Sequence, residues 1–531
     1  MKKYNVFKIL TISILVTVVL SFLIPQTSFD NYGNLSKGSI NPISIIDSFA
    51  NGLTSLGVFL NAFVYILCIG IFYFVLKKTK KYDETITNTA YMFRNKKVVF
   101  NIISICTFAI VTAITGDVMP MLIFVPAFID ISKKLGYDSK ISILTTIGSI
   151  ILGSSASLYT NYANQILGSV VGDNILFKII ILLITIVSLI VFTVVFGKTP
   201  EDTKLEKVGK KSVSFISISF DIILVLILLG MTSWSSYFGF NGFTELHSNI
   251  ANFKIFNVSP FISLIGASVA ALGSWTVFDL SVLLLILSLI SAIVYRVKFD
   301  ELLQSVAEGI KKSLPYALII VIANIVLVNV YNSGFFYTIL TGLAKMSDKL
   351  FSSTIISMLA SFVYPDYTYA SQFTLSTITA VASSTEFNIV LALIFQAIYS
   401  LFLLIMPTSV LILIGLRYTN VRYKDWFKFI FKYVIVLLTF IFTILFVASI
   451  NFIGIPSIIF LIIISIIGYA LLIVSLVLKF SSKNVVVEPK KEEIKVETKT
   501  EEVKKEEPKK QATQVKKPTT KKKATNKKSK K

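Results

Sequence analysis

Charged residues and the usual catalytic side chains are scarce in this sequence. Only 15% of its 531 residues are Asp, Glu, Lys or Arg, against about a quarter in soluble domains. The two cysteines lie inside apolar runs, and the single histidine, His247, has no cysteine near it, which argues against a disulfide framework and a metal site. Gly197-Lys198-Thr199 lacks the upstream glycine of a phosphate-binding loop, so ATP-driven transport by this chain is not expected.

Apolar residues, in contrast, make up 54% of the chain and form long runs. A helix needs about 20 apolar residues to cross a bilayer, and runs close to that length recur at 7–24, 53–76, 175–196, 277–295, 313–332, 426–449 and 457–478. The first run ends FLIPQTS without a small-residue cleavage site, so we expect a retained helix rather than a signal peptide. The sequence predicts an all-α polytopic membrane protein.

Basic residues indicate how the chain is oriented. They crowd three loops, whereas four other loops have few; the basic loops are 77–97, 204–211 and 417–424, and the others are 25–52, 233–258, 384–387 and 450–456. The positive-inside rule places the basic loops in the cytoplasm. We therefore expect about ten crossings of the cell membrane with both termini cytoplasmic. This count requires that 98–132 enters and leaves from the inside, and 352–383 from the outside.

Nearly half of the formal net charge of +22 lies in the tail at 483–531, which holds 18 Lys and 8 Glu. The tail has almost no large apolar residues and cannot form a core, so we expect it to be disordered. A basic tail beside a bilayer is predicted to contact anionic membrane lipids. Charge alone also fits RNA, but nothing in the sequence indicates a specific nucleic-acid partner.

Each of the two stretches that return to their own side has a polar interruption in its middle. AITGDVMP, at 113–120, interrupts the first, and SFVYPDYTYASQ, at 361–372, interrupts the second. Proline breaks a helix, and freed backbone groups within a bilayer are tolerated only where they line a cavity or pack against protein. We predict two re-entrant hairpins.

A second interruption follows each hairpin. GSSASLYTN, at 153–161, lies in the run 141–165, and MPTS, at 406–409, lies in the run 388–416. A hairpin followed by a broken helix, occurring twice in opposite membrane orientation, is typical of secondary transporters with inverted repeats. The alternative is a small-residue packing patch and a simple proline kink. The predicted parts are a first repeat at 1–212, a second at 213–455, an extra transmembrane helix at 456–482 and the tail at 483–531.

Several motifs resemble the anaerobic C4-dicarboxylate carrier family of the ion transporter superfamily. They are GDVMP, VPAFIDISKKLGYDS and the Ser/Thr/Asn break, then EGIKKSLPYAL, PTS and VRYKDWFKFI. The resemblance covers roughly residues 5–450 and is greatest to the branch proposed to carry basic amino acids such as arginine and ornithine. It implies a symporter or antiporter and no enzyme. It allows Na⁺ or H⁺ as the coupling ion, no other cofactor, and a homodimer.

The polar breaks and the resemblance give the candidate substrate- or ion-binding residues. A carboxylate within a membrane is costly and usually functional, so Asp117 and Asp366, one in each hairpin, are the first candidates. The alternative is that each carboxylate caps its own turn. The full set is Thr115, Gly116, Asp117, Ser154, Ser155, Ser157, Thr160, Asn161, Pro365, Asp366, Thr368, Tyr369, Ser371, Gln372, Gln396, Pro407, Thr408 and Ser409.

The second break departs from the family pattern, because AIYSLFLLIM stands where the family is usually polar and rich in glycine. No Lys or Arg lies in either tip or either break. With two acids nearby, a cationic or zwitterionic ligand is easier to hold than a dicarboxylate. We therefore favour an amino acid over a C4-dicarboxylate as the small-molecule substrate. The rival function is a carrier-derived membrane scaffold without transport activity.

Overall fold

The computed structural model describes residues 5–484 except 30–34, 159–161, 169–171, 198–199, 201–204, 209–213, 265 and 383. The described part is built from helices and one short antiparallel pair of strands, β1 (Thr27–Phe29) and β2 (Leu35–Lys37). Thr160, Asn161 and the lysine-rich tail from residue 485 on lie outside the described residues. The prediction of an all-α polytopic membrane protein is confirmed.

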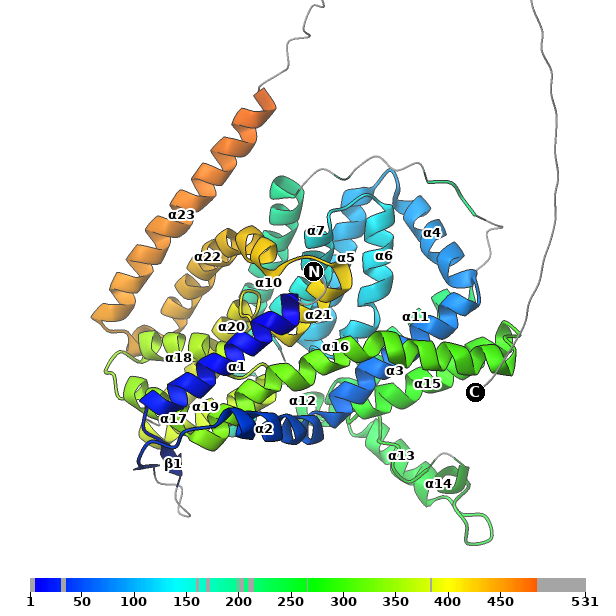
Figure 1. The fold of residues 1–531 in the computed structure, drawn as a ribbon, viewed down its shortest axis with the longest axis horizontal. Coiled ribbons are helices and arrows are strands. Elements are labelled where there is room, and N and C mark those ends of the chain that lie inside the picture. Colours follow the sequence, from blue (N-terminus) through cyan, green and yellow to red (C-terminus); the bar gives the residue numbers. More distant parts are fainter. Residues whose placement is uncertain are drawn as a thin grey trace, which may run out of the picture. The chain divides into compact units, whose positions relative to one another are not determined.

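The first half of the chain forms both long and short helices (Figure 1). They are α1 (Asn5–Leu23), α2 (Ile45–Val58), α3 (Leu60–Lys78), α4 (Lys81–Phe93), α5 (Lys97–Thr115), η2 (Pro120–Ile123), α6 (Val125–Lys134), α7 (Ser139–Ile143), η3 (Leu144–Gly148), α8 (Ser149–Ser154), α9 (Tyr162–Leu167), α10 (Ile175–Val191) and η4 (Phe192–Phe196).

The second half begins after the basic loop near residue 208. Its helices are α11 (Phe215–Met231), α12 (Trp234–Phe238), α13 (Gly242–Asn252), α14 (Pro260–Leu264), α15 (Val277–Val294), α16 (Phe299–Ser333), α17 (Phe335–Ala344), α18 (Lys349–Val363), α19 (Tyr367–Val381), α20 (Thr385–Leu403), α21 (Val410–Thr419), α22 (Tyr423–Ala448), η5 (Ile450–Phe452) and α23 (Ile455–Asn484).

Nine helices among the described residues are long and apolar enough to cross a membrane. Eight of them match predicted crossings: α1, α3, α10, α15, α16, α20, α22 and α23. The ninth is α5, the first arm of the predicted hairpin at 98–132. The two other predicted crossings are shorter. The crossing required between the loops 204–211 and 233–258 is α11, which has 17 residues, and the first broken helix is continuous only from Ser139 to Ser154. Their orientation and the division into two inverted repeats stay predictions.

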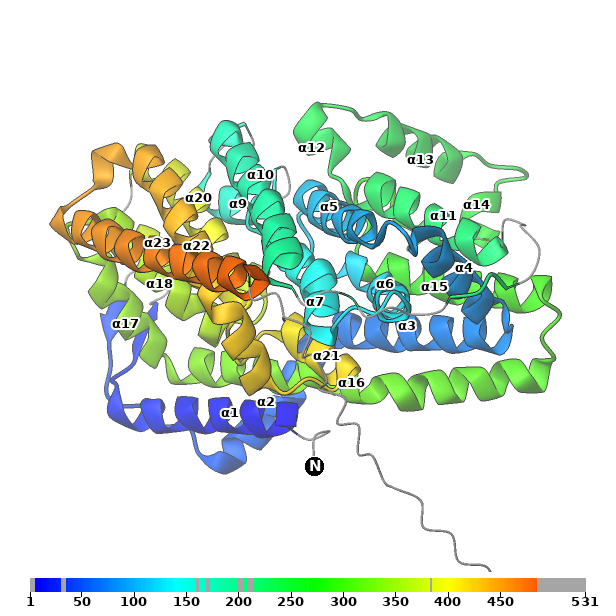
Figure 2. The same cartoon turned by 90° about the horizontal axis from the view of Figure 1, so that it is seen from above.

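Two helices differ from the predicted apolar runs. The run 53–76 is divided, since α2 ends at Val58 and α3 begins at Leu60. Conversely, α16 extends unbroken from Phe299 to Ser333 although it contains Pro315. The extension has a packing cause: Ser305, Gly309 and Ser313 form a buried small-residue face on its polar first half, and that face lies along α3 (Figure 2).

The backbones of α3 and α16 approach closely at glycine. A Cβ atom at Gly309 would lie 2.7 Å from the Cα atom of Ile71, and one at Gly70 would lie 2.8 Å from the carbonyl oxygen of Gly309. Small residues permit such approaches between membrane helices, where packing rather than the hydrophobic effect drives association. This crossing joins a helix of the first half to a helix of the second.

We expect Gly309→Ala to destabilise the protein, because the new methyl group meets backbone atoms that cannot rotate away. Overpacking of this kind typically costs about 1–3 kcal/mol. The thermal unfolding midpoint in detergent measures the effect. Gly342→Ala in α17 is the matched control, since a Cβ atom there meets nothing within 4 Å. Equal midpoints for the two variants would show that α3 and α16 accommodate the added methyl group without loss of stability.

Candidate functional site

The first hairpin turns at its predicted polar tip. Helix α5 ends at Thr115, and Gly116 follows with φ +73°, a left-handed conformation that glycine adopts without strain. Helix α6 then returns along α5, since the ring of Phe128 lies 5.0 Å from Phe108. Within the turn, Asp117 Oδ1 accepts a hydrogen bond of 2.9 Å from the Met119 amide. Asp117 therefore caps its own turn, which was the structural alternative from the sequence.

Two tyrosines of α3 hold the return segment of this hairpin. Tyr65 Oη donates to the Pro120 carbonyl at 3.0 Å, and Tyr73 Oη donates to the Ile123 carbonyl at 2.7 Å. Both tyrosines are buried, and their bonds satisfy carbonyls that the short η2 helix leaves free. Sequence reasoning did not identify them. Their spacing of eight residues, which places both on one face of a helix, is the signal that could have done so.

The second hairpin also turns at its predicted tip. Helix α18 ends at Val363, and Asp366 is the N-cap of α19, with Oδ1 accepting from the Thr368 amide at 3.0 Å and the Tyr369 amide at 3.2 Å. The carbonyl of Tyr364, which follows the end of α18, accepts a 2.7 Å hydrogen bond from Tyr399 Oη of α20. Both candidate aspartates thus cap turns, and each does so through one of its two carboxylate oxygens.

The first broken helix ends where α20 crosses it. Gln396 Nε2 donates to the carbonyl oxygens of Ser154 at 3.0 Å and Ser157 at 3.1 Å, and Ser154 Oγ donates to Ser400 Oγ at 3.1 Å. A helix that stops inside a membrane leaves carbonyls without partners. Here a side chain from the second half of the chain supplies the missing donors. Gln396, Ser154 and Ser157 are therefore brought together as predicted candidates.

The two halves repeat one contact between a break and a hairpin. In the first half, the Leu158 amide donates to the Ala113 carbonyl in the last turn of α5, at 2.8 Å. In the second half, Thr408 Oγ1 donates to the Phe362 carbonyl in the last turn of α18, at 2.7 Å. Each broken helix is therefore hydrogen-bonded to the end of the first arm of the hairpin that precedes it.

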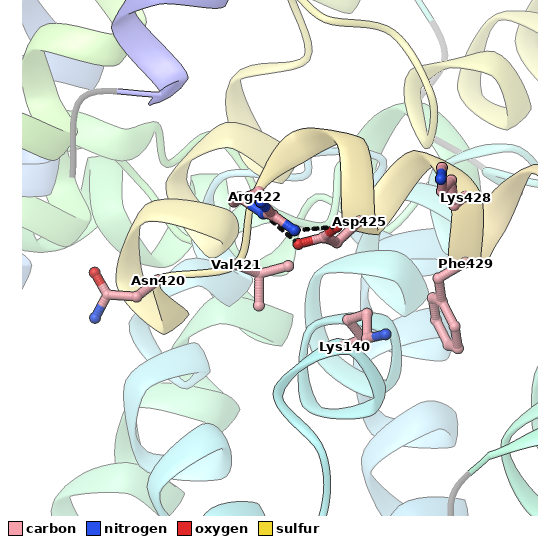
Figure 3. A pocket seen from close by; sticks show the side chains of 7 residues that line it. All are labelled: Lys140, Asn420, Val421, Arg422, Asp425, Lys428 and Phe429. Atoms are coloured by element: carbon pink, nitrogen blue, oxygen red, sulfur yellow. Dashed lines mark hydrogen bonds and ion pairs between the residues drawn. The ribbon is translucent and has the colours of Figure 1, made fainter. Parts of the chain in front are cut away.

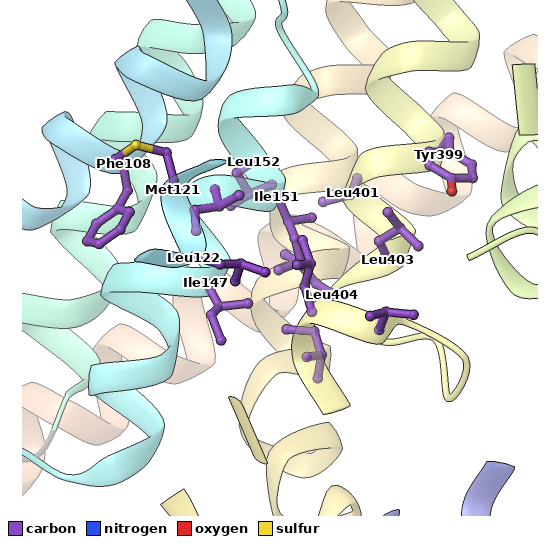
Figure 4. Close-up of a cluster of buried hydrophobic side chains, with 14 of the residues drawn as sticks. Phe108, Met121, Leu122, Ile147, Ile151, Leu152, Tyr399, Leu401, Leu403 and Leu404 are labelled. Carbon is purple, nitrogen blue, oxygen red and sulfur yellow. The ribbon is translucent and has the colours of Figure 1, made fainter. Parts of the chain in front are cut away.

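Apolar side chains fill the crossing between the broken helices. Figure 4 shows Ile147, Ile151 and Leu152 of η3 and α8 against Leu401, Leu403 and Leu404 at the end of α20. On the other side of this crossing, α21 packs against α7 and η3. The apolar stretch that replaces the family's polar residues therefore serves as packing between the halves.

The two hairpin aspartates are 249 positions apart in the sequence. Their carboxylates are close enough for their charges to interact. Two like charges in a medium of low dielectric constant repel strongly. A cation or a proton between two carboxylates relieves such a repulsion.

The remaining candidates differ in their surroundings. The hydroxyls of Thr115 and Ser155 bond to carbonyls of their own helices, and Ser371 and Ser409 are buried. Tyr369 packs edge-on against Phe59, at 5.4 Å between ring centres. Gln372 is exposed on α19 and is not brought to the other candidates. Partly buried at the second tip and the second break are Pro365, Thr368 and Pro407.

A cavity of about 300 Å³ lies between the two halves. Its walls come from α3, η2 and α6 on one side and from α16 and α21 on the other. Tyr73, which holds the first hairpin, is part of the wall, so the cavity adjoins that hairpin. The charged residues in its lining are Lys77 and Lys312; the others are Ile66, Ile69, Gly70, Tyr73, Phe74, Leu122, Val125, Pro126, Ser313, Tyr316, Ile414, Gly415 and Tyr418. Both lysines are exposed. An apolar cavity whose charged lining residues are both cations suits an organic anion.

One buried cation, Lys178, was not among the candidates predicted from the sequence. Lys178 lies in the first turns of α10 and is only 1% exposed. Its ammonium group makes no hydrogen bond within the described residues, although the charge of Asp173 acts on it. A buried ammonium without a hydrogen-bond partner is costly and marks a functional candidate. The signal was available, since Lys178 is the only charged residue in the apolar run 175–196.

Metal-ligating side chains do not gather in the described ranges: no three His, Cys, Asp or Glu residues there could hold a metal ion. A site for Na⁺, if built from hydroxyl and carbonyl oxygens, needs no such cluster.

Residues 4–450 match the profile of the DcuC family, described as C4-dicarboxylate anaerobic carriers. No curated protein matches the sequence. Among solved structures, the YdaH transporter of Alcanivorax borkumensis is similar at a TM-score of 0.37 and 12% identity, covering 86% of this chain and 99% of that one.

Proposed function

Since the chain belongs to the family of C4-dicarboxylate anaerobic carriers, we propose that it is a secondary transporter of a C4-dicarboxylate. Family membership supports a carrier rather than an enzyme. The observation that carries the choice of substrate is the cavity between the halves, whose only charged lining residues are Lys77 and Lys312. Two ammonium groups favour a ligand with two carboxylates.

This substrate differs from the one favoured by the sequence alone. An amino acid was favoured because no Lys or Arg lies in the hairpin tips or the breaks. The cavity lining provides positive charge from other segments. A basic amino acid would have to enter beside two lysines with no acid in the cavity lining, which costs electrostatic energy.

We assign the coupling cation to the space between the hairpin tips. Asp117 and Asp366 would share a Na⁺ ion or a proton, which relieves the repulsion between their carboxylates. Their caps fix the carboxylates on the turns, so that a relative movement of the hairpins changes the distance between them. Substrate bound beside the first hairpin would thereby be linked to the ion, as alternating access requires.

Uptake into proteoliposomes tests the proposed function. The purified chain is reconstituted and offered labelled succinate and fumarate, and separately arginine and ornithine. We expect uptake of the dicarboxylates that depends on an imposed Na⁺ or H⁺ gradient. Uptake of arginine or ornithine alone would overturn the substrate assignment. Absence of uptake for every compound, with correctly folded protein, would support the scaffold instead.

We expect Lys312→Gln to raise the KM for the dicarboxylate by about 10-fold or more, because a hydrogen bond to a charged group contributes about 1.5–3 kcal/mol. Lys311→Gln is the matched control: Lys311 and Lys312 are both exposed, but Lys311 is not part of the cavity lining. Initial rates of uptake at varied substrate concentration measure the effect. Equal KM values for the two variants would exclude Lys312 from the substrate path.

A further inference from the structure

A second hollow, of about 620 Å³, lies outside the transport site where the start of α7 meets the start of α22 (Figure 3). Its charged lining residues are Lys140 of α7 and Arg422, Asp425 and Lys428 at the beginning of α22. Asn420, Val421 and Phe429 complete the lining. The hollow therefore presents three cations and one carboxylate on two helices that are far apart in sequence.

The carboxylate in the hollow, of Asp425, is already paired with an arginine. Arg422 donates to both oxygens of Asp425, from Nε at 2.6 Å and from Nη2 at 2.9 Å. These hydrogen bonds raise the pKa of the Arg422 guanidinium above its ordinary high value. The Asp425 charge is thus neutralised, and the two lysines determine the sign of the hollow.

The two lysines remain available to an anion. Lys140 Nζ lies 3.9 Å from Asp138, at the limit of an ion pair, and 5.3 Å from the ring centre of Phe429. Asp138 is already engaged as the N-cap of α7, with Oδ1 accepting from the Lys140 amide at 3.1 Å. Lys428 is exposed and makes no ion pair within the described ranges.

The surroundings of the hollow place it at the membrane surface. Lysines recur every four residues at the start of α22, at Lys424, Lys428 and Lys432, so they lie on one side of the helix. Phe427 and Phe431 stack on each other at 5.1 Å, and Phe431 is 40% exposed. Basic residues and exposed rings at the end of a membrane helix are typical of the depth at which lipid headgroups lie.

We propose that this hollow binds the phosphate of an anionic phospholipid, from the leaflet that these lysines face. The lysines contact the headgroup, and the rings of Phe427 and Phe431 lie beside its acyl chains. A free phosphate would use the same cations but not the exposed rings.

The bound lipid would join the two halves of the transporter. Lys140 stands at the start of the first broken helix, while Trp426 Nε1 donates to the Leu404 carbonyl at the second break, at 2.8 Å. A phosphate held by Lys140 and Lys428 therefore bridges segments that lead directly to both breaks. This inference is independent of which substrate is carried.

Native mass spectrometry and thermal unfolding of the full chain in nanodiscs test the proposal. Nanodiscs of phosphatidylcholine are compared with nanodiscs that also contain phosphatidylglycerol. We expect retained phosphatidylglycerol and a higher unfolding midpoint for the natural sequence. A basic residue near an anionic bilayer contributes about fivefold in affinity, so Lys140→Gln with Lys428→Gln should weaken retention roughly 25-fold.

The control removes the same charge elsewhere. Lys298→Gln with Lys311→Gln changes two exposed lysines, the N-cap of α16 and a residue within it, that are not part of the hollow, and retention should be unchanged. Lys140→Arg with Lys428→Arg should restore it. If both pairs of Gln substitutions weaken phosphatidylglycerol retention equally, the effect comes from net charge alone, and the proposed site is wrong. Full stabilisation by inorganic phosphate in pure phosphatidylcholine would identify a soluble anion as the ligand instead.

Discussion

Replacing Asp366 by asparagine should leave the protein folded and remove most of its transport activity. Asparagine is as good an N-cap as aspartate, so its side-chain oxygen can still accept from the Thr368 and Tyr369 amides that Asp366 now binds. The substitution removes the charge and keeps the cap. It therefore separates ligand binding from turn capping, the two roles that the sequence left open for Asp366.

The expected loss follows from the proposed cation site. Without the Asp366 charge, Asp117 alone faces the coupling ion, and coupling between sites is typically worth about 1–3 kcal/mol, or roughly 5–150-fold. Ion-driven uptake by proteoliposomes should fall within that range. Counterflow of substrate, which needs no ion gradient, should fall less.

The control for this variant is another capping aspartate. Asp138 is the N-cap of α7 and lies outside both hairpins, so Asp138→Asn should transport normally. Unfolding midpoints of both variants check that the caps survive. Undiminished, ion-dependent uptake by Asp366→Asn would leave Asp366 as a turn cap only, and the coupling ion would have to bind elsewhere.

The hairpin tips could be predicted because their cause is local. Gly116 supplies the left-handed residue that ends α5, and Asp366 supplies the cap that begins α19. Such residue types interrupt a helix wherever they stand, and a transmembrane run makes the interruption conspicuous. The breaks at 153–161 and 406–409 were visible for the same reason, although the Thr160 and Asn161 part of the first break lies outside the described residues.

The partners of these breaks could not be predicted, because they come from distant segments. Lys77 and Lys312 meet in one cavity although 235 positions separate them. A local pattern does not show which helices adjoin, so the positive charge of the cavity was invisible and an amino acid was favoured. The length of α16 has the same explanation: its polar first half is helical because Gly309 and Ser313 pack closely on α3.

Replacing Gln396 by leucine should be severely destabilising. Gln396 is a partner distant in sequence that stabilises the first break. Its amide group donates to two carbonyl oxygens of the first break, at Ser154 and Ser157. Gln396 is 1% exposed, so water cannot replace it. An unsatisfied buried acceptor costs about 1–3 kcal/mol. Loss of both bonds should therefore cost roughly 2–6 kcal/mol.

Glutamate at this position is the sharper test, because it has nearly the shape of glutamine. Gln396→Glu keeps the packing but replaces the two N–H donors by an acceptor, which repels both carbonyls unless it is protonated. We expect a lower unfolding midpoint at neutral pH that recovers partly in acid, where the protonated carboxyl regains one donor. Transport should be lost with the shape of the break.

Gln372 offers the matched position, since it is exposed on α19 and far from the break in sequence. Gln372→Glu and Gln372→Leu should both unfold and transport like the natural sequence. Gln396 is one of the contacts between the second half of the chain and the first half's broken helix, beside the hydrogen bond from Ser154 to Ser400. If Gln396→Leu keeps both its midpoint and its uptake, the carbonyls of Ser154 and Ser157 need no donor from Gln396, and the first break must be held by its other contacts.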